Sequence, residues 1–249
     1  YDRAANTPAN AKMTEPKRHI AGDKTHIEFQ CGVYVDPKSG DIYAVNNDTV
    51  DDMVIFSREA RGNVPPNRML HTPHGTFGIA VHEEREELFL TVQHDNAIIV
   101  YKKYADAEEP PIRLIQGDKT RLADPHGIAI DTQAELIYVT NYGATKSYEQ
   151  ERPKRGSGVN PNWPLQDAAP GTGRFYPPSI TVYGLNDRGD IAPRRVITGT
   201  KTRLNWATGM AIDKQRNELL VANDMGDEVL VFNLDAEGDA APVRVMKGP

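Results

Sequence analysis

His126-Gly127-Ile128-Ala129-Ile130-Asp131 is one of four closely similar hexapeptides in this chain, and the others begin at Cys31, Phe77 and Thr208. Each copy is followed by a polar turn and a second apolar run, then by a third run and a fourth that reads Pro-x-Arg-x-x. In its shorter copies the unit repeats about every 46 to 49 residues, the length of one four-stranded propeller blade.

The apolar runs of each unit are predicted to be strands. They are short, rich in Val, Ile and Tyr, and bounded by Gly, Pro, Asn and Asp. No window of helical length keeps a helical apolar period. Because a lone four-stranded sheet cannot bury both of its faces, neighbouring units must stack around an axis. The sequence therefore predicts an all-β fold, a β-propeller of four-stranded antiparallel blades.

The repeats predict one domain over residues 1–249, with four complete blades. A leading segment, Pro16 to Gly22, resembles the fourth-strand segment Pro111 to Gly117, so an outer strand is expected near residues 18–21. One outer strand and four blades do not close a ring, which predicts a piece of a longer propeller of six blades. The alternative is that the first thirty residues close the ring in a way of their own.

The repeat resembles that of the NHL-repeat propellers, in particular the bacterial, mostly exported multi-repeat type. Within one unit the matching segments are Ile128 to Asp131, Ile137 to Asn141, Ile180 to Tyr183 and Ala192 to Gly199. The resemblance covers nearly the whole chain except about 143–178. It implies a propeller exported to the periplasm or cell surface. Similar propellers are binding scaffolds, whereas relatives include lyases and hydrolases with a metal in the axial channel.

The composition excludes two classes of partner. The net charge is −6 and the pI is about 5.7, so the chain has no basic surface of the kind that binds nucleic acid. No apolar stretch is long enough to span a membrane. The single cysteine, Cys31, cannot form an internal disulfide, and there is no Gly-x-Ser-x-Gly motif. No catalytic residue is predicted.

Three histidines are candidate metal ligands. The loop before each innermost strand and the loop between the second and third strands are expected on one face, and His74, His94 and His126 fall in these loops. Neutral imidazoles with a carboxylate such as Asp95 or Asp224 suit a zinc-type ion, which can polarise a carbonyl or activate water. The alternative is that the histidines line a wet rim and hydrogen-bond to loop backbone.

The same loops carry other polar candidates. The acidic run at 48–52 offers oxygen ligands that suit calcium, but it lacks the spacing of a defined calcium loop. An asparagine ends the second strand in three blades, at Asn46, Asn141 and Asn223. These amides are candidates for ligand binding; the alternative is that they hydrogen-bond their own turns. The motif glycines predict close packing or a positive φ, and the recurring arginines of the fourth run predict solvated edge charges.

The third unit contains an insertion at about 143–178, between its second and third strands. Long loops of this kind are usually functional or disordered. The insertion combines basic and aromatic side chains, which are the residue types that anchor interfaces: Arg152, Arg155, Trp163, Phe175 and Tyr176. It is therefore a candidate recognition element. The alternative is a lid that contacts only its own blade.

These patterns favour a non-catalytic binding or assembly propeller, which recognises a protein partner or a second copy of itself through loops on one face. A small-molecule ligand is compatible with the same loops. The alternative is a metal-dependent hydrolase or lyase that uses zinc or calcium at the mouth of the central channel.

Overall fold

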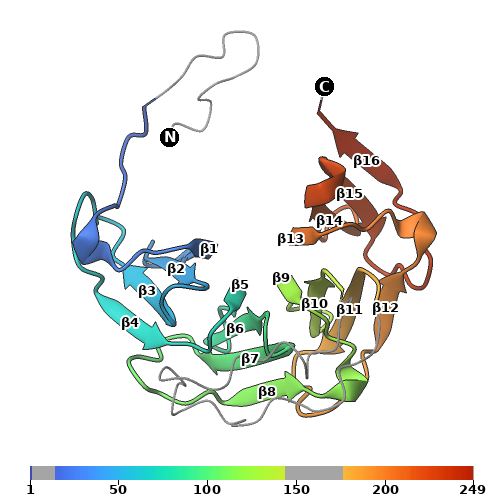
Figure 1. The fold of residues 1–249 in the computed structure, drawn as a ribbon, viewed down its shortest axis with the longest axis horizontal. Helices are drawn as coiled ribbons and strands as arrows, with labels where there is room; N and C mark the ends of the chain where they lie inside the picture. Colours follow the sequence, from blue (N-terminus) through green and yellow to red (C-terminus); the bar gives the residue numbers. More distant parts are fainter. Residues whose placement is uncertain (2–14, 144–175, 249) are drawn as a thin grey trace.

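The computed structural model describes residues 1, 15–143 and 176–248. It contains four four-stranded antiparallel sheets arranged as blades around an axis (Figure 1), which confirms the predicted β-propeller. The first blade consists of β1 (Gln30–Val35), β2 (Ile42–Asn46), β3 (Asp52–Phe56) and β4 (Arg68–His71). The second consists of β5 (Thr76–His82), β6 (Glu87–Val92), β7 (Ala97–Lys102) and β8 (Arg113–Gln116).

The other two blades repeat this order. The third consists of β9 (Pro125–Asp131), β10 (Leu136–Asn141), β11 (Ser179–Gly184) and β12 (Arg195–Thr198). The fourth consists of β13 (Ala207–Asp213), β14 (Glu218–Asn223), β15 (Glu228–Asn233) and β16 (Arg244–Lys247). The described helices are 3-10 turns of three residues: η2 (Asp23–Thr25), η3 (Asp118–Thr120), η4 (Thr200–Thr202) and η5 (Asp224–Gly226). No helix of the described part is long and apolar enough to cross a membrane.

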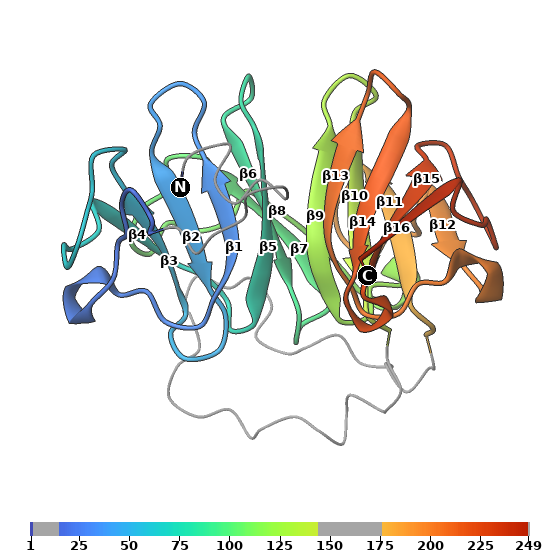
Figure 2. The same ribbon diagram turned by 90° about the horizontal axis from the view of Figure 1, so that it is seen from above.

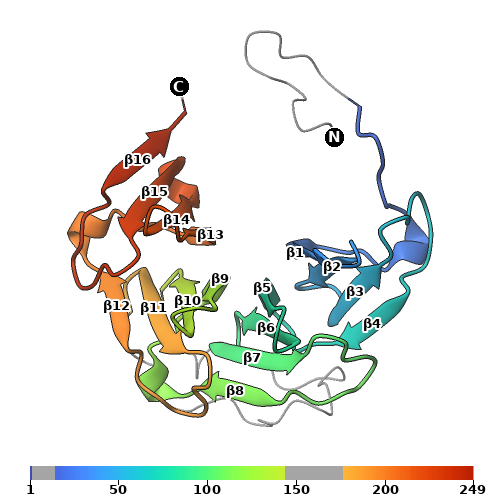
Figure 3. The ribbon, with the colours of Figure 1, turned by 180° about the vertical axis from the view of Figure 1, so that it is seen from behind.

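Each repeated hexapeptide lies on the innermost strand of its blade. β1, β5, β9 and β13 face the axis, the fourth strands lie at the rim, and the arc is open between the first and fourth blades (Figures 1 and 3). The strands run between two faces of the arc (Figure 2). Because the start of each innermost strand pairs with the end of the second strand, as Gln30 does with Asn46, two sets of loops share one face. We call this the loop face.

The apolar core lies between consecutive blades. Leu70, Ile115 and Ile197 occupy the same position of the fourth strand, and each is completely buried against the following blade. Met246 is their counterpart in the fourth blade and is 43% exposed. In the first blade, Val33 is 55% exposed on the side opposite the second blade. The first and fourth blades therefore expose, on their outward sides, residue positions that are packed against a neighbouring blade inside the arc.

Close packing at the axis explains the motif glycines. A Cβ atom at Gly32, Gly78 or Gly127 would lie within 3.0 Å of a carbonyl oxygen in the next blade. These glycines do not have a positive φ. Gly209, in the fourth blade, has nothing within 4 Å of such an atom. Of the two explanations that the sequence offered, close packing is the one observed.

The recurring arginines are not the freely solvated edge charges that the sequence predicted. Where the second strand carries a tyrosine, the guanidinium donates to its hydroxyl; where it does not, the guanidinium pairs with a glutamate that begins this strand. The pairs are Arg68 with Tyr43, Arg195 with Tyr138, Arg113 with Glu87 and Arg244 with Glu218. Arg195 also donates to the Leu234 and Ala236 carbonyls of the next blade. Arg68 likewise donates to the Ala105 carbonyl of the next blade, so Arg68 and Arg195 fasten blades together, whereas Arg113 and Arg244 pair within their own blades.

The leading segment occupies the place of a fourth strand but forms only an isolated bridge. Ile20 bridges Gly62 in the β3–β4 loop, just as Leu70 bridges Ala107 one blade further on. In the described residues this segment has no third strand beside it, so it lacks the ladder that would extend the bridge. The position of the predicted outer strand near 18–21 is thus occupied, with less regular structure than expected.

Candidate functional site

In every blade, one residue on the loop face has a left-handed backbone conformation. It lies two residues before the first residue of the repeated hexapeptide. Its φ is 32° at Phe29, 77° at Gly75, 55° at Asp124 and 54° at Trp206. A residue with a Cβ atom adopts this region at a cost of about 1–2 kcal/mol, whereas glycine adopts it freely. Phe29 is 63% exposed and Trp206 is 49% exposed. Two aromatic side chains are thus held toward solvent where glycine would be less strained.

Four rings from three blades form a row on the loop face, which we call the aromatic row. Phe77 of β5 meets the His126 ring of β9 edge to face, with centroids 4.2 Å apart. His126 stacks on Tyr142 at 3.4 Å, and Tyr142 stacks on Trp206 at 5.1 Å. His126 is almost fully buried. The exposed face of Trp206 therefore continues a stack whose inner members are fixed by packing.

An imidazole and a carboxyl group with shifted pKa values lie in this row. His126 Nδ1 donates a hydrogen bond to the backbone carbonyl oxygen of Asp124, 3.0 Å away, which selects one neutral tautomer. Burial lowers the pKa of His126 to about 4, despite this hydrogen bond, and His94 contributes to the lowering. Burial raises the pKa of Asp124 to about 6, although a hydrogen bond with Gln93 opposes it. At neutral pH the pair is an uncharged imidazole beside a carboxylate.

A second polar group lies between the first two blades, and we call it the His–Asp cluster. One possible ligand atom from each of Asp48, His74 and His94 lies within 4.8 Å of the others, and all three residues are exposed. The His74 and His94 ring centroids are 5.0 Å apart. The sequence predicted that His94 and His126 approach one another with His74 beside them, and the structure brings only His74 and His94 together in this cluster. His126 is not in the cluster, because its ring is stacked on Tyr142.

The acidic run at 48–52 faces histidines. Asp51 Oδ1 lies 3.1 Å from His74 Nδ1, and Asp52 Oδ1 lies 2.6 Å from His71 Nδ1. Burial raises the pKa of Asp52, which the adjacent His71 opposes. Asp51 and Asp52 therefore pair with different imidazoles instead of converging on one point as calcium ligands would.

The three predicted asparagines have structural partners. Asn46, Asn141 and Asn223 are at most 1% exposed. Each accepts a hydrogen bond from a backbone amide in the loop before its innermost strand, 2.6 to 3.0 Å away. Asn46 and Asn223 also donate to a carbonyl of that loop. Their amides hold the loop before the innermost strand, rather than their own turns as the structural alternative had predicted. A direct role in ligand binding stays a prediction.

The remaining predicted residues are scattered. The Asp95 carbonyl accepts a hydrogen bond from Gln116. Asp224 begins η5. The pKa of Tyr142 is raised to about 12, mainly by burial and further by the charge of Asp224. Tyr176 is half-buried, with its carbonyl beside Gly143. The predicted insertion residues Arg152, Arg155, Trp163 and Phe175 lie outside the described residues. Asp124 and Trp206 were not predicted as site residues. Their signal in the sequence is that they occupy the repeat position held by Gly75 in the second blade, where the backbone is left-handed.

Cys31 lies half-buried near the start of β1, beside the loop face. Burial raises the pKa of its thiol, and the negative charge of Asp48 adds to this effect. A raised pKa disfavours the thiolate that nucleophilic chemistry needs. The geometry therefore gives no support to a cysteine nucleophile.

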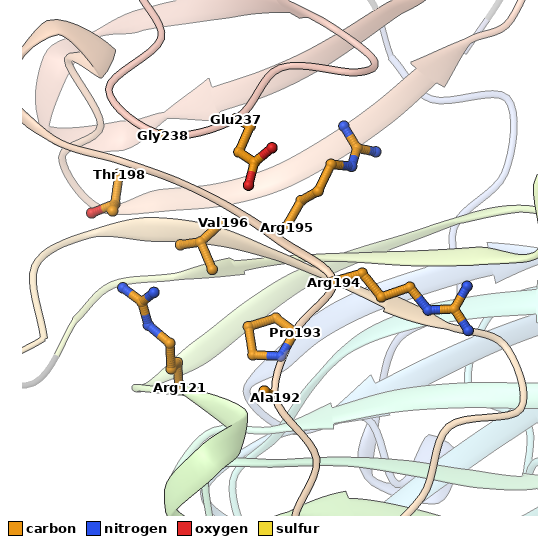
Figure 4. Close-up of a pocket in the computed structure, with 9 residues that line it drawn as sticks. All are labelled: Arg121, Ala192, Pro193, Arg194, Arg195, Val196, Thr198, Glu237 and Gly238. Atoms are coloured by element: carbon orange, nitrogen blue, oxygen red, sulfur yellow. The ribbon is translucent and has the colours of Figure 1, made fainter.

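A shallow pocket of about 380 Å³ lies at the outer rim between the third and fourth blades (Figure 4). Its lining includes Arg121, Arg194, Arg195 and Glu237. Arg195 is hydrogen-bonded to Tyr138 and Arg194 to Asp187, so both guanidinium groups have partners within the fold. The carboxylate of Glu237 also enters the pocket (Figure 4). These features indicate a structural seam between blades rather than a ligand site.

No protein-family model and no curated protein matches this sequence. Among solved structures, the chain is similar to a chain in the crystal structure of a nidogen/laminin complex, with a TM-score of 0.56 and 15% sequence identity. The similarity covers 88% of this chain and 65% of that chain, so the present chain spans 65% of the matched chain's length. At this identity the likeness shows the fold alone. The chain is a β-propeller, and its resemblance to the NHL-repeat type stays a prediction.

Proposed function

We propose that this chain is a non-catalytic binding propeller of the NHL-repeat type, which recognises a protein segment on its loop face. The observation that carries the proposal is the aromatic row, and in particular Trp206. Its ring is about half exposed on a left-handed residue and rests on Tyr142. Strained conformations of this kind concentrate at functional sites, and tryptophan is enriched among the residues that dominate binding energy.

The charges around the row favour a basic partner. Asp124 and Asp224 flank the Tyr142 ring closely enough to raise its pKa, and Asp48 lies at the neighbouring blade. The chain as a whole has a net charge of −6. A cationic side chain can stack on the Trp206 face through a cation–π interaction while the carboxylates balance its charge. We therefore propose a partner segment that presents arginine, lysine or aromatic side chains.

The similar solved structure contains a propeller in a complex of two proteins, nidogen and laminin. This supports a binding role without identifying a partner for the present chain. The resemblance to exported multi-repeat propellers supports a location in the periplasm or at the cell surface. Assembly with a second copy is an alternative form of the same role, and gel filtration at increasing concentration tests it.

Selection of displayed random peptides on the immobilised full chain tests the proposed site. We expect the selected peptides to be enriched in basic and aromatic residues, and Trp206→Ala to weaken their binding at least about tenfold. Val243→Ala is the matched control, because Val243 is 54% exposed in the same blade but precedes the rim strand β16. Unchanged affinity in Trp206→Ala, or equal losses in both variants, would contradict the assignment.

A metal-dependent hydrolase or lyase is a second candidate. The observation in its favour is Asp124, whose pKa of about 6 is in the range of a general acid or base and whose Oδ1 is buried without a hydrogen-bond partner. The neutral His126 imidazole lies beside it. Hydrolysis of lactone or ester substrates that is lost in Asp124→Asn, with the fold intact, would favour the enzyme over the binding propeller.

A further inference from the structure

We propose that Asp48, His74 and His94 form a binding site for one zinc-type divalent ion at the junction of the first two blades. The three residues belong to three different loops of the loop face. Asp48 follows β2, His74 precedes β5, and His94 follows β6. The site does not require the peptide-binding role proposed above, because it takes an ion and no peptide, although Asp48 is also one of the charges assigned to that role.

The distances are compatible with a common ion. One possible ligand atom of each residue lies within 4.8 Å of the other two. Zinc binds nitrogen and oxygen ligands at about 2.0–2.2 Å, so ligand atoms of one tetrahedral site are about 3.3 Å apart. The side chains are exposed, and small rotations about their χ angles close the remaining distance without moving the backbone.

The loops that carry the ligands are tied together beside each ligand. The Gly75 amide donates to the Asn47 carbonyl at 3.1 Å, and the Gln93 amide donates to the Gly75 carbonyl at 2.7 Å. The Asn47 side chain, which is 2% exposed, donates to the Thr76 carbonyl at 3.0 Å. Asn47, Gly75 and Gln93 each adjoin one ligand in sequence. The backbone of the site is therefore in place before an ion arrives, which reduces the entropy lost on binding.

Gly75 determines how the two imidazoles meet. It has a φ of 77°, and a Cβ atom there would lie 3.0 Å from Cγ and Nδ1 of His94. Other blades place Phe29, Asp124 or Trp206 at this position. Only glycine leaves the space that the His94 ring fills beside His74. The local sequence His74-Gly75 thus supplies one ligand and the room for the other.

The donor set selects the kind of ion. Two imidazole nitrogens with one carboxylate oxygen suit zinc and similar transition ions, whereas calcium prefers six to eight oxygen ligands. Three protein ligands leave a fourth zinc position open, and the exposure of the cluster directs that position toward solvent.

Titration of zinc into chelator-treated full-length chain tests the site, with the metal alone as the probe. We expect one ion per chain and an affinity at least tenfold weaker in His74→Ala and in His94→Ala, because even partners of metal ligands contribute ten- to a hundredfold. His19→Ala is the control, since His19 is exposed next to the Ile20 bridge, away from the cluster. Circular dichroism confirms that each variant is folded.

The competing explanation is that His74 serves only as the ion-pair partner of Asp51, 3.1 Å away. Asp51→Asn separates the two explanations, because it removes this ion pair and leaves all three proposed ligands. Because Asp51 is a partner of a proposed ligand, we expect Asp51→Asn to keep one zinc ion per chain and to weaken its binding less than His74→Ala does. We also expect cobalt substitution to give the absorption bands of a four-coordinate ion. Absence of stoichiometric binding, or equal losses in His19→Ala and His94→Ala, would overturn the proposal.

Discussion

Lys103 Nζ lies 2.8 Å from Asp36 Oδ2 across the junction of the first two blades, and both side chains are at most 2% exposed. Glu83 Oε1 is also 2.8 Å from this ammonium group. Burial alone would raise the pKa of Asp36, but hydrogen bonds from Lys103 and from backbone amides lower it to about 2. Asp36 is the last residue of the first repeated hexapeptide, so the repeat supplies the carboxylate of this buried ion pair.

Loss of Lys103 should destabilise the propeller more than loss of the lysine that pairs with the equivalent hexapeptide aspartate two blades on. Lys214 pairs with Asp131, which ends the third hexapeptide, but the Lys214 side chain is 43% exposed. We expect Lys103→Met to lower the free energy of unfolding by about 3–5 kcal/mol, because it leaves buried carboxylates unpaired. Lys214→Met should cost less, because water can replace the half-exposed Lys214 ammonium group beside the buried Asp131 carboxylate. Urea unfolding of both variants measures the difference, and equal costs would contradict the role assigned to burial.

The motif glycines provide a second matched pair. Gly127→Ala places a Cβ atom within 3.0 Å of the Thr208 carbonyl oxygen, so we expect a loss of about 1–3 kcal/mol or more in unfolding free energy. Gly209→Ala meets nothing within 4 Å and should change stability by no more than about 0.5 kcal/mol. Urea unfolding compares the two variants, and similar losses in both would count against the role assigned to close packing at the axis.

The sequence predicted the blades well because each one is encoded by local patterns. The run 41–45 predicted β2, observed at Ile42–Asn46, and the run 98–101 predicted β7, observed at Ala97–Lys102. The role of the arginines was wrong because it depends on a neighbouring strand. Whether Arg113 faces solvent or pairs with Glu87 is decided by the register between strands far apart in sequence.

The site was predicted only in part, since side-chain direction is not encoded in the repeat. His94 was expected to meet His126 with His74 beside them, but it meets His74, and His126 turns into the aromatic row. Backbone packing at Gly78, next to His126, and the left-handed turn at Gly75 decide these directions. Trp206 became a candidate only when its backbone could be compared with the equivalent positions of the other blades.

Two opposing pH effects are expected in the aromatic row. His126 has a pKa of about 4 in the folded state and 6.5 in the reference state, so the unfolded chain binds more protons between these values. The stability that this group contributes is therefore lost as the pH falls from 6.5 to 4. Asp124 has a raised pKa of about 6 against 3.8, so its protonation stabilises the folded state as the pH falls from 6 to 4.

Single substitutions should separate these effects. Between pH 6.5 and 4, the free energy of unfolding of Asp124→Asn should fall more steeply than that of the wild type. His126→Gln should fall less steeply. Urea unfolding at several pH values measures the slopes, and the shifted carboxylates elsewhere, such as Asp36, affect all three proteins alike. Parallel curves for the three proteins would show that neither group titrates as its burial requires.

Replacement of the insertion tests whether it is the main recognition element. Gly143 and Tyr176 are adjacent, because a Cβ atom on Gly143 would lie 2.5 Å from the Tyr176 carbonyl oxygen, so a short Gly-Ser linker can join them in place of residues 144–175. Surface loops change length at small cost, and we expect the unfolding free energy to stay within about 1–2 kcal/mol of the wild type. Binding of the selected peptides should be lost if the insertion's basic and aromatic side chains contribute to recognition. If the shortened protein binds them as before while Trp206→Ala does not, recognition resides in the aromatic row and the insertion only covers its own blade.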